Sequence, residues 1–475
     1  MGLIRQQTTR WVFGGMVLAV ACSSSSTPPP AAGDSGASID GGGVGGDAGS
    51  ALDGGGVSGW SAATAVDSVI TGATSSVPAV AIDPAGNVVV AWNQSDGTKP
   101  RVWANRYVVA SSAWGGAVPI SNDAGNSTSS VQVATDVGGN VVAVWSQDLR
   151  IWANRWSADA GAWSTAERVE LASGSTNFGP KIAVDREGNA TVVWSQNSTG
   201  QIANPEHVWA NRWSIASGTW GDAGRLESDS VSAKYASVAA CGSGDVVAAW
   251  IHSALLRPNV YANRWASGAW QGAVRVDGED GGTAGGPPGV GCDDGGVALV
   301  FWVQSAGGFA NRFVGGAWGD AGMVSPASDA GTEAAPTVAV DWAGNAVAAW
   351  TEVVGSDSII RGARYNAAAG TWVGATLDNA SAGMAYSPSV GIDADGGATV
   401  VWYQMESGAS VNSVWLNHAA AAAGDWVGAS VLAVHGSGAA YPRVAVNASG
   451  RAAVAWQVQS QSTDGGPFIW VNIYK

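Results

Sequence analysis

Four glutamates have the clearest potential for acid–base chemistry in this chain. They are Glu206, Glu279, Glu352 and Glu406, and all lie near or within predicted loops. Two carboxyl groups flanking a glycosidic bond would suffice for its hydrolysis, one as the general acid and the other as base or nucleophile. Sequence spacing does not identify which of the four are neighbours in space, so we assign no catalytic residue.

Other signatures of catalysis are missing from the sequence. The four histidines have no metal-ligand spacing with cysteine or with one another; they are His207, His252, His418 and His435. The chain contains no G-x-S-x-G, P-loop or H-E-x-x-H motif. We therefore expect no metal, no cofactor and, on balance, no enzymatic activity.

Two sets of charged residues recur at fixed positions. The acidic set is Asp83, Asp136, Asp185, Asp341 and Asp393. The basic set is Arg106, Arg155, Arg212, Arg264, Arg312 and Arg364. The aspartates are interpreted as caps of their own D-x-x-G-N turns, with a ring of Ca²⁺ ligands as the alternative. The arginines are expected to stack on a neighbouring tryptophan or to bind a carbonyl, with an anionic-glycan ring as the alternative.

One motif is written eight times along the chain. A phrase such as 78–92, with Asp83, Gly86-Asn87 and a closing tryptophan, returns every 48 to 56 residues. The closing tryptophans are Trp92, Trp145, Trp194, Trp250, Trp302, Trp350, Trp402 and Trp456. A W-A-N-R phrase, drifted in the later copies, follows each copy, and a third tryptophan follows all but the last; 24 of the 26 tryptophans are thus in phase, all except Trp11 and Trp342. Glutamines two residues after the closing tryptophan are interpreted as structural.

Each repeat holds four short Val-, Ala- and Trp-rich runs separated by Gly, Asn and Asp, which predicts four antiparallel strands. Four strands recurring about every 50 residues are typical of one blade of a β-propeller. The absence of an amphipathic helical period argues against helical solenoids. The sequence therefore predicts an all-β, eight-bladed propeller.

The two ends of the chain indicate how the ring closes. The third-tryptophan phrase occurs once before the first repeat, at Trp60, and is missing after Trp470 in the last repeat. We expect the strand around Trp60 to complete the last blade, which removes the exposed edge of an open array. An open array of eight units is the alternative.

The hairpin at 157–163, Ser-Ala-Asp-Ala-Gly-Ala-Trp, resembles the S-x-D-x-G-x-x-W hairpin of bacterial secreted propellers with BNR or Asp-box repeats. It is one residue short of that pattern, and other copies keep only Gly and Trp. The resemblance covers the repeats and implies the propeller fold. Sialidases share such hairpins, but their arginine triad and nucleophile cannot be placed on this chain.

Loop lengths vary on one face only. The spacing between second-strand and third-strand aromatics runs from 7 residues (Trp145 to Trp152) to 15 (Trp194 to Trp209). The loops between second and third strands share a face with the blade-to-blade connections, and variable loops on a rigid scaffold commonly bind ligands. We name this the variable-loop face. Neutral drift of loops is the alternative.

The two largest insertions, 197–207 and 277–288, supply the candidate ligand-binding residues. These are Glu206, His207, Asp277 and Glu279. The preferred ligand is a glycan or a protein. The alternatives are a glycan-active hydrolase or lyase of the propeller type and a structural scaffold of an envelope assembly.

Cys241 stands where the repeat has its turn aspartate, and we expect Cys292 at the same position of the next repeat. Equivalent first-strand positions of adjacent blades lie side by side, within the ~4.4–6.8 Å between Cα atoms that a disulfide needs. We therefore predict a Cys241–Cys292 bridge, with two buried free thiols as the alternative.

The N-terminus predicts export. Arg5 and Arg10 precede an apolar run at 11–21, which has the length of a signal-peptide core. The sequence up to Cys22 resembles a bacterial lipobox, with Ala19 in place of the usual leucine; ordinary A-x-A cleavage is the alternative. We expect a signal peptide at 1–21, a Gly/Ser/Pro tether at 22–57 and the propeller at 58–475. The predicted location is an outer-membrane lipoprotein facing either the periplasm or the exterior.

The charge balance excludes some partners. The chain has 22 Lys and Arg against 37 Asp and Glu, a net charge of -15, and lysine occurs only four times. Such a surface repels phosphate backbones and anionic headgroups, so we expect no nucleic acid and no membrane contact except through the lipid. We expect a monomer.

Lipidation of Cys22 is testable directly. In Cys22→Ala we expect loss of membrane association, and in the wild type processing that is sensitive to globomycin, because the thiol is the acylated group. Fractionation and the mass of the mature protein measure both. Normal processing of the variant to a soluble protein of the same mature mass would contradict lipidation.

Overall fold

The computed structural model describes residues 58–67, 76–122, 127–170, 176–197, 205–228, 231–254, 257–278, 284–326, 332–379, 383–406, 408–421, 425–434, 438–458 and 469–475. These residues form strands β1 to β37 and contain no helix. Within them, accordingly, no helix is long and apolar enough to cross a membrane. The predicted signal peptide, Cys22 and the tether lie outside the described residues.

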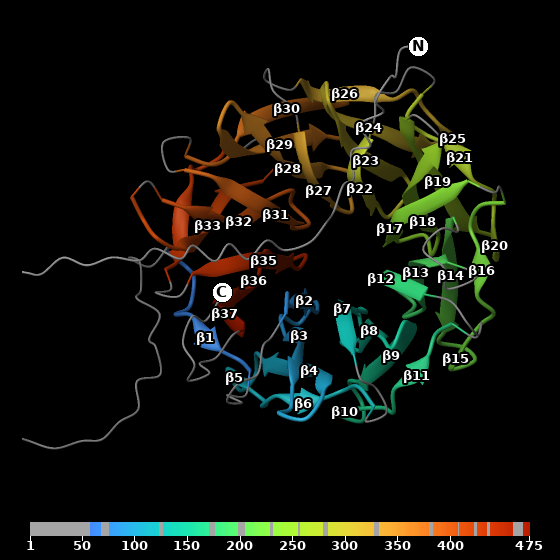
Figure 1. The fold of residues 1–475 in the computed structure, drawn as a ribbon, viewed down its shortest axis with the longest axis vertical. Coiled ribbons are helices and arrows are strands. Elements are labelled where there is room, and N and C mark those ends of the chain that lie inside the picture. The colour runs from blue at the N-terminus through green and yellow to red at the C-terminus, as the bar shows by residue number, and fades with distance from the viewer. Residues whose placement is uncertain are drawn as a thin grey trace, which may run out of the picture. The chain divides into compact units, whose positions relative to one another are not determined.

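Eight antiparallel sheets stand around a central axis, one sheet per repeat, as the sequence predicts (Figure 1). We number them blades 1 to 8 from β2 onward. The first strands, which surround the axis, are β2 (Ala79–Ile82), β7 (Thr128–Thr135), β12 (Thr176–Val184), β17 (Ser232–Ala240), β22 (Ala284–Cys292), β27 (Thr332–Val340), β31 (Ala385–Ile392) and β35 (Ala439–Val446). The second strands are β3 (Val88–Ser95), β8 (Val141–Gln147), β13 (Ala190–Asn197), β18 (Val246–Ala254), β23 (Ala298–Gln304), β28 (Ala346–Val354), β32 (Ala398–Met405) and β36 (Ala452–Val458).

The outer half of each blade is less regular. The third strands are β4 (Pro100–Val108), β9 (Arg150–Ser157), β14 (Glu206–Ser214), β19 (Arg257–Ala266), β24 (Gly307–Val314), β29 (Asp357–Asn366), β33 (Asn412–Ala419) and β37 (Ile469–Tyr474). In blades 1 to 5 the fourth strand is split into two pieces that both pair with the third strand. These pieces are β5 (Ala113–Trp114) and β6 (Val118–Pro119), β10 (Ala162–Trp163) and β11 (Glu167–Arg168), β15 (Thr219–Trp220) and β16 (Gly224–Arg225), β20 (Ala269–Trp270) and β21 (Val274–Arg275), and β25 (Ala317–Trp318) and β26 (Gly322–Pro326). Blades 6, 7 and 8 have β30 (Thr371–Thr376), β34 (Ser430–Ala433) and β1 (Thr64–Ala65).

The N-terminal strand completes blade 8, so the predicted ring closure is confirmed. Strand β1 pairs with β37 through Thr64 and Val471, and Trp60 bridges to Tyr474. The first strand of blade 1, β2, contacts the first strand of blade 8, β35. Figure 1 shows blue β1 against red β37, and an open array is excluded.

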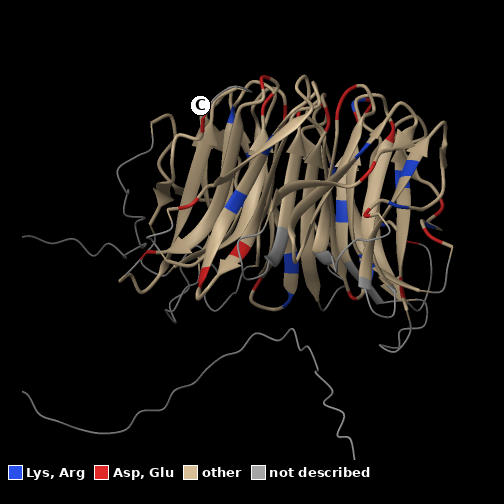
Figure 2. Cartoon of the chain, turned by 90° about the horizontal axis from the view of Figure 1, so that it is seen from above, with Lys and Arg blue, Asp and Glu red and all other residues tan. Residues whose placement is uncertain are grey.

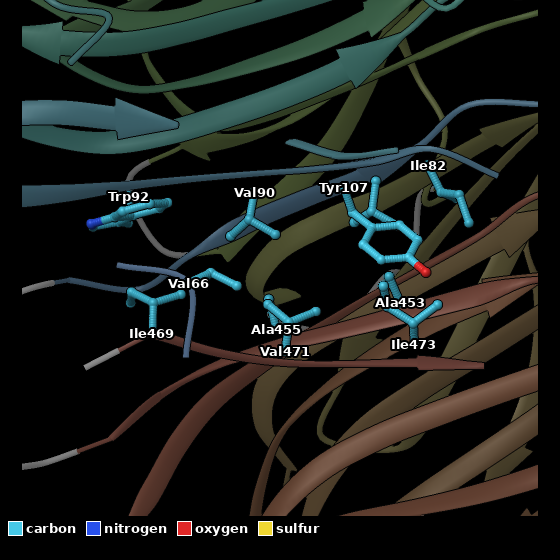
Figure 3. Close-up of a cluster of buried hydrophobic side chains, with 11 residues drawn as sticks. Val66, Ile82, Val90, Trp92, Tyr107, Ala453, Ala455, Ile469, Val471 and Ile473 are labelled. Carbon is cyan, nitrogen blue, oxygen red and sulfur yellow. The ribbon is translucent and has the colours of Figure 1, made fainter. Parts of the chain in front are cut away.

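The closing seam has a continuous apolar core. Val66, which follows β1, is 3% exposed and packs in a cluster with Ile469 and Val471 of blade 8 and Val90 and Trp92 of blade 1 (Figure 3). Each fully buried side chain of this size stabilises the fold by about 1.5–3 kcal/mol. Residues from the two ends of the chain therefore share one core.

The closing tryptophan of every repeat is buried, at 0 or 1% exposure in all eight blades. In five blades its indole N–H donates to the glutamine two residues later, as from Trp92 to Gln94 at 3.0 Å. Where another residue replaces that glutamine, the indole finds no acceptor among the residues that the structure describes; these tryptophans are Trp250, Trp350 and Trp456. The glutamines are therefore structural, as predicted.

The asparagine of the W-A-N-R phrase fastens neighbouring blades together. Its side-chain amide donates to a carbonyl at the end of the preceding blade, as from Asn154 to Ile120 at 2.9 Å. The same bond joins Asn105 to Val66, Asn211 to Val169, Asn263 to Leu226, Asn311 to Val276 and Asn417 to Leu377. The Asn105 bond spans the closing seam.

The recurring aspartates and arginines have the expected structural roles. Asp83 accepts the backbone N–H of Asn87 at 2.8 Å and its amide at 2.7 Å, and equivalent turns repeat this capping. Arg155 lies 3.3 Å from the ring centroid of Trp213 in the next blade. Arg106, Arg212, Arg264 and Arg312 likewise lie over an aromatic ring of the next blade, and Arg364 donates to the Gly396 carbonyl.

The predicted disulfide is confirmed, with a Cα–Cα distance of 4.9 Å, but its register was wrong by one residue. In blade 5 the turn position belongs to Asp293, which accepts the N–H of Val297, and Cys292 is the last residue of β22. The cause is a double glycine: Gly296, at φ 82°, takes the left-handed turn position, whereas the register expected for Cys292 would require Gly295 there. Blade 5 has therefore kept its turn aspartate.

Deletion of the closing strand tests the seam. Removing residues 1–66 should lower the free energy of unfolding by at least about 2 kcal/mol relative to removing 1–55, because it exposes the edge of β37 and the core around Val66. Denaturant unfolding of the two truncated proteins measures the difference. Coincident unfolding curves would show that the strand contributes nothing.

Candidate functional site

The first strands form the wall of a channel along the ring axis. We count wall positions backward from the turn residue of each blade, which is Asp83, Asp136, Asp185, Cys241, Asp293, Asp341, Asp393 or Asn447. The three positions before the turn line a cavity of about 400 Å³ whose walls are almost all Val, Ile, Ala and Gly. This half of the channel offers a ligand few polar partners.

Within seven residues before the turn, the charged residues of the wall are all basic, and Glu333 of β27 lies eight residues before its turn. From one to seven residues before the turn, the eight first strands contain Lys181, Lys234 and Arg443 and no aspartate or glutamate. Figure 2 shows that most Asp and Glu positions of the propeller lie instead in loops at the two ends of the ring. In a chain with 37 acidic and 22 basic residues, a wall with this composition is exceptional.

Lys181 of β12 and Arg443 of β35 occupy the same repeat position, four residues before the turn. Both side chains keep some solvent-accessible surface because the channel is open, although they lie deep inside the protein. Burial inside the ring and, to a smaller extent, the charge of Arg443 together lower the pKa of Lys181 to about 8. Burial also lowers the pKa of Arg443, an effect that Tyr441 opposes.

Four tyrosines lie nearer the variable-loop face. Tyr386 and Tyr403 form a cross-strand pair in blade 7, and Tyr441 of blade 8 packs edge-on against Tyr403; both pairs of ring centroids are 5.7 Å apart. Tyr441 is 37% exposed and Tyr235 of blade 4 is 46% exposed. The ammonium group of Lys234 lies 5.0 Å from the Tyr235 ring centroid.

The backbone aims two of these tyrosines outward. Tyr235 and Tyr441 lie six residues before the turn with φ of 60° and 51°, at a β-bulge where the register of the first two strands shifts. Bulky residues rarely adopt this conformation, which accumulates at functional sites. At the same position Gly179 has a φ of 56°, and a Cβ added there would meet no atom within 4 Å. A side chain at this position therefore extends into open space.

The candidate residues chosen from sequence lie elsewhere. His207 is buried with its Nδ1 2.9 Å from Glu227, and Asp277 is buried with an oxygen 2.6 Å from the Arg275 Nε. Glu206 is half-buried at the start of β14. Glu279 lies outside the described residues, so its assignment, like that of the other three, stays a prediction.

The glutamates considered for catalysis are also separated by their surroundings. Glu352 is fully buried and accepts the Arg361 Nε at 2.7 Å, while Glu406 is exposed. Within the part of the chain that the structure describes, no group of three His, Cys, Asp or Glu side chains is placed to hold a metal ion.

Asp277 belongs to a repeat position that sequence reasoning missed. The fourth strand is followed by the residue whose carbonyl accepts the asparagine bond from the next blade, and the residue after that one is acidic in several blades. Its carboxylate accepts a backbone N–H of the third strand: Ile151 donates to Glu170 at 3.0 Å and Val208 to Glu227 at 3.1 Å. Asp378 holds this place in blade 6, where burial raises its pKa to about 6. In blades 2 and 3 these carboxylates bond the end of the blade to its third strand.

Sequence reasoning also missed the channel residues. Most blades have a small residue four positions before the turn; these are Ala79, Ser237, Gly289, Thr337 and Ser389. Lys181 and Arg443 break that pattern, and lysine is among the rarest residues of the chain. Comparing the first strands for exceptions to the repeat, instead of for shared residues, would have revealed them.

No family model and no curated protein matches this chain. Solved structures share its general architecture. A polysaccharide lyase, Uly1, is 9% identical over 84% of this chain and 89% of its own, with a TM-score of 0.47. A Hadza microbial sialidase, Hz136, is 9% identical over 82% and 74%, at 0.44, and a Dyadobacter fermentans protein of unknown function is 14% identical over 64% and 96%, at 0.40. At these values the likenesses carry no argument about function.

The fold and the wall together define the class: an eight-bladed β-propeller whose channel carries tyrosines at one mouth and unpaired cations within. We name the region formed by Tyr235, Tyr386, Tyr403 and Tyr441 the channel mouth.

Asp378 gives a pH-dependent prediction. Folding raises its pKa from 3.8 to about 6, so ionisation is less favourable in the folded protein than in the unfolded chain. The protonated carboxyl therefore contributes its full stability below about pH 4, and this contribution is lost as pH rises through 6. Asp378→Asn should therefore stabilise the protein at pH 7, by up to about 2 kcal/mol, and not at pH 4. Urea unfolding at both pH values measures this, with exposed Asp395→Asn as the control. Equal effects of Asp378→Asn at the two pH values would contradict the raised pKa.

Proposed function

We propose that this chain is a carbohydrate-binding propeller whose ligand docks at the channel mouth. The observation that carries the proposal is the set of partly exposed tyrosines, two of them held outward on left-handed bulge residues. A sugar ring presents C–H faces that pack on aromatic rings, and its hydroxyls bond to polar groups nearby, including phenol oxygens. Strained aromatic positions around an open channel suit this role.

A protein ligand fits the surface less well. A protein-binding face needs a contiguous apolar patch. The large exposed apolar side chains of the described residues are instead spread over different blades, among them Val118, Leu149, Val274, Val373 and Val427. Three of the tyrosine rings, in blades 7 and 8, pack together with neighbouring centroids 5.7 Å apart.

Hydrolysis at this mouth is also disfavoured. Glycoside hydrolysis needs two carboxyl groups flanking the bond. The wall from one to seven residues before the turn has none, and Glu352, which a hydrolase reading would use, is committed to Arg361. Binding therefore accounts for the mouth better than cleavage.

An exported location fits a glycan ligand. The disulfide suits an oxidising compartment outside the cytoplasm. We propose that the protein is a lipid-anchored outer-membrane protein and that residues 22–57 hold the propeller away from the membrane. Envelope or environmental polysaccharides would then be within its reach.

Affinity for polysaccharides tests this function. Tyr441→Ala and Tyr386→Ala should each weaken binding by about tenfold or more, because aromatic anchors dominate such contacts. The matched control is Trp342→Ala, which removes a 53% exposed aromatic from the opposite, turn-side face.

A glycan array followed by affinity electrophoresis provides the measurement. Retention of wild-type affinity in both tyrosine variants, or no binding of any polysaccharide, would contradict the proposal. Release of shortened or unsaturated products would show that the protein is a hydrolase or lyase instead.

A further inference from the structure

Two channel cations lack the partners that other basic residues of this chain have. Arg212 pairs with Asp185, Arg264 with Asp245 and Arg361 with Glu352. Among the described residues, by contrast, Lys181 has no hydrogen-bond or ion-pair partner, and Arg443 makes one bond, from Nη1 to its neighbour's carbonyl, Pro442, at 3.0 Å. A guanidinium has five N–H donors, so most of those on Arg443 are free.

An unpaired cation inside a protein is costly, because burial removes water without supplying a counter-charge. Lys181 and Arg443 share one channel and carry the same charge, so they repel each other. This repulsion adds to the free-energy cost of burying each cation. No carboxylate lies within seven residues before the turn in any blade to offset them. An anion from outside would relieve both.

The depth of the pair relates it to the channel mouth. Arg443 lies two residues beyond Tyr441 along β35, a rise of about 7 Å at the spacing of a β-strand. A group projecting from a sugar that rests on the tyrosines would reach this level. The small residues of five other blades at the same position leave the channel open there.

The structure therefore points to a ligand class. We propose that Lys181 and Arg443 form an anion-binding site within the channel that takes a carboxylate or sulfate group of an acidic polysaccharide docked at the channel mouth. This inference rests on the proposed function for the polysaccharide, and on the cation pair alone for the anion. Charge-assisted hydrogen bonds from a lysine and an arginine are the strong contacts for such groups.

Substitutions borrowed from other blades test the site without disturbing the fold. Lys181→Gln introduces the residue of blade 2, Gln132, and Arg443→Ser that of blade 7, Ser389. The control is Lys475→Gln, which removes one positive charge from an exposed position at the C-terminus. Circular dichroism and thermal unfolding establish that each variant folds.

Calorimetric titration compares three polymers: polygalacturonate, which carries carboxylates, heparin, which carries sulfates, and neutral dextran. We expect each channel variant to weaken the binding of at least one acidic polymer by about tenfold or more, and Lys475→Gln to change it less than about twofold. Wild-type affinity for both acidic polymers in both channel variants would overturn the anion site.

The pH dependence gives a second readout. Binding of the acidic polymer should weaken as pH rises through about 8, where Lys181 loses its proton. The other ionisable groups on strands packed around Lys181 are Lys234 and Tyr235 on β17 and the arginines of β9, and the charge of Arg443 on β35 also acts on Lys181. Lys181→Gln should therefore abolish the dependence between pH 7 and 9, and its persistence would contradict our assignment.

The two proposals fail differently. Binding of neutral and acidic polymers with equal affinity, lost only in Tyr441→Ala, would overturn the anion site and leave the proposed function standing. Binding of free sulfate that depends on Lys181 and Arg443, without binding of any polymer, would overturn the polysaccharide as ligand.

Discussion

The structure depends on the burial of each blade's apolar face against the next blade. A four-stranded sheet of this composition is apolar on both faces, and the closing tryptophans fill the space between sheets with 0 or 1% exposure. Every sheet needs a neighbouring sheet on each of its two faces. The outer apolar faces of the first and last blades are therefore buried only when the row of blades closes into a ring. The seam at Val66 is consequently as well packed as any other interface.

Polar groups inside this ring serve the same purpose. The asparagine bonds to the preceding blade, the glutamines under the indoles and the capped turns all satisfy backbone or side-chain groups that the packing has removed from water. Many charged residues of the repeat belong to this framework, including Asp277, which pairs with Arg275. Lys181 and Arg443 on the channel wall differ from these residues in having no such ion-pair partner among the described residues.

Residues that depart from the repeat distinguish individual blades from one another. In the Cys241–Cys292 bridge, Cys241 replaces a turn aspartate. Tyrosines on left-handed bulges and the two channel cations each occur in two blades and replace neutral residues. The framework tolerates them because the first strands face open channel and not packed core. A rigid ring can thus carry a local site at its axis with little cost to the interfaces between blades.

The sequence by itself determined the eight blades, their four strands, the closure at Trp60 and the structural roles of the recurring aspartates, arginines and glutamines, because repetition reports local geometry eight times over. It erred by one residue at Cys292, since either of two adjacent glycines can take a left-handed turn position. The candidate ligand residues that it placed in long loops stay a prediction, and the structure buries Asp277 beside Arg275 and His207 beside Glu227. Only the tertiary structure brought Lys181 and Arg443 into one channel. Their strands are three blades apart around the ring and more than 250 residues apart in the chain, and no local sequence pattern encodes which residues share a channel.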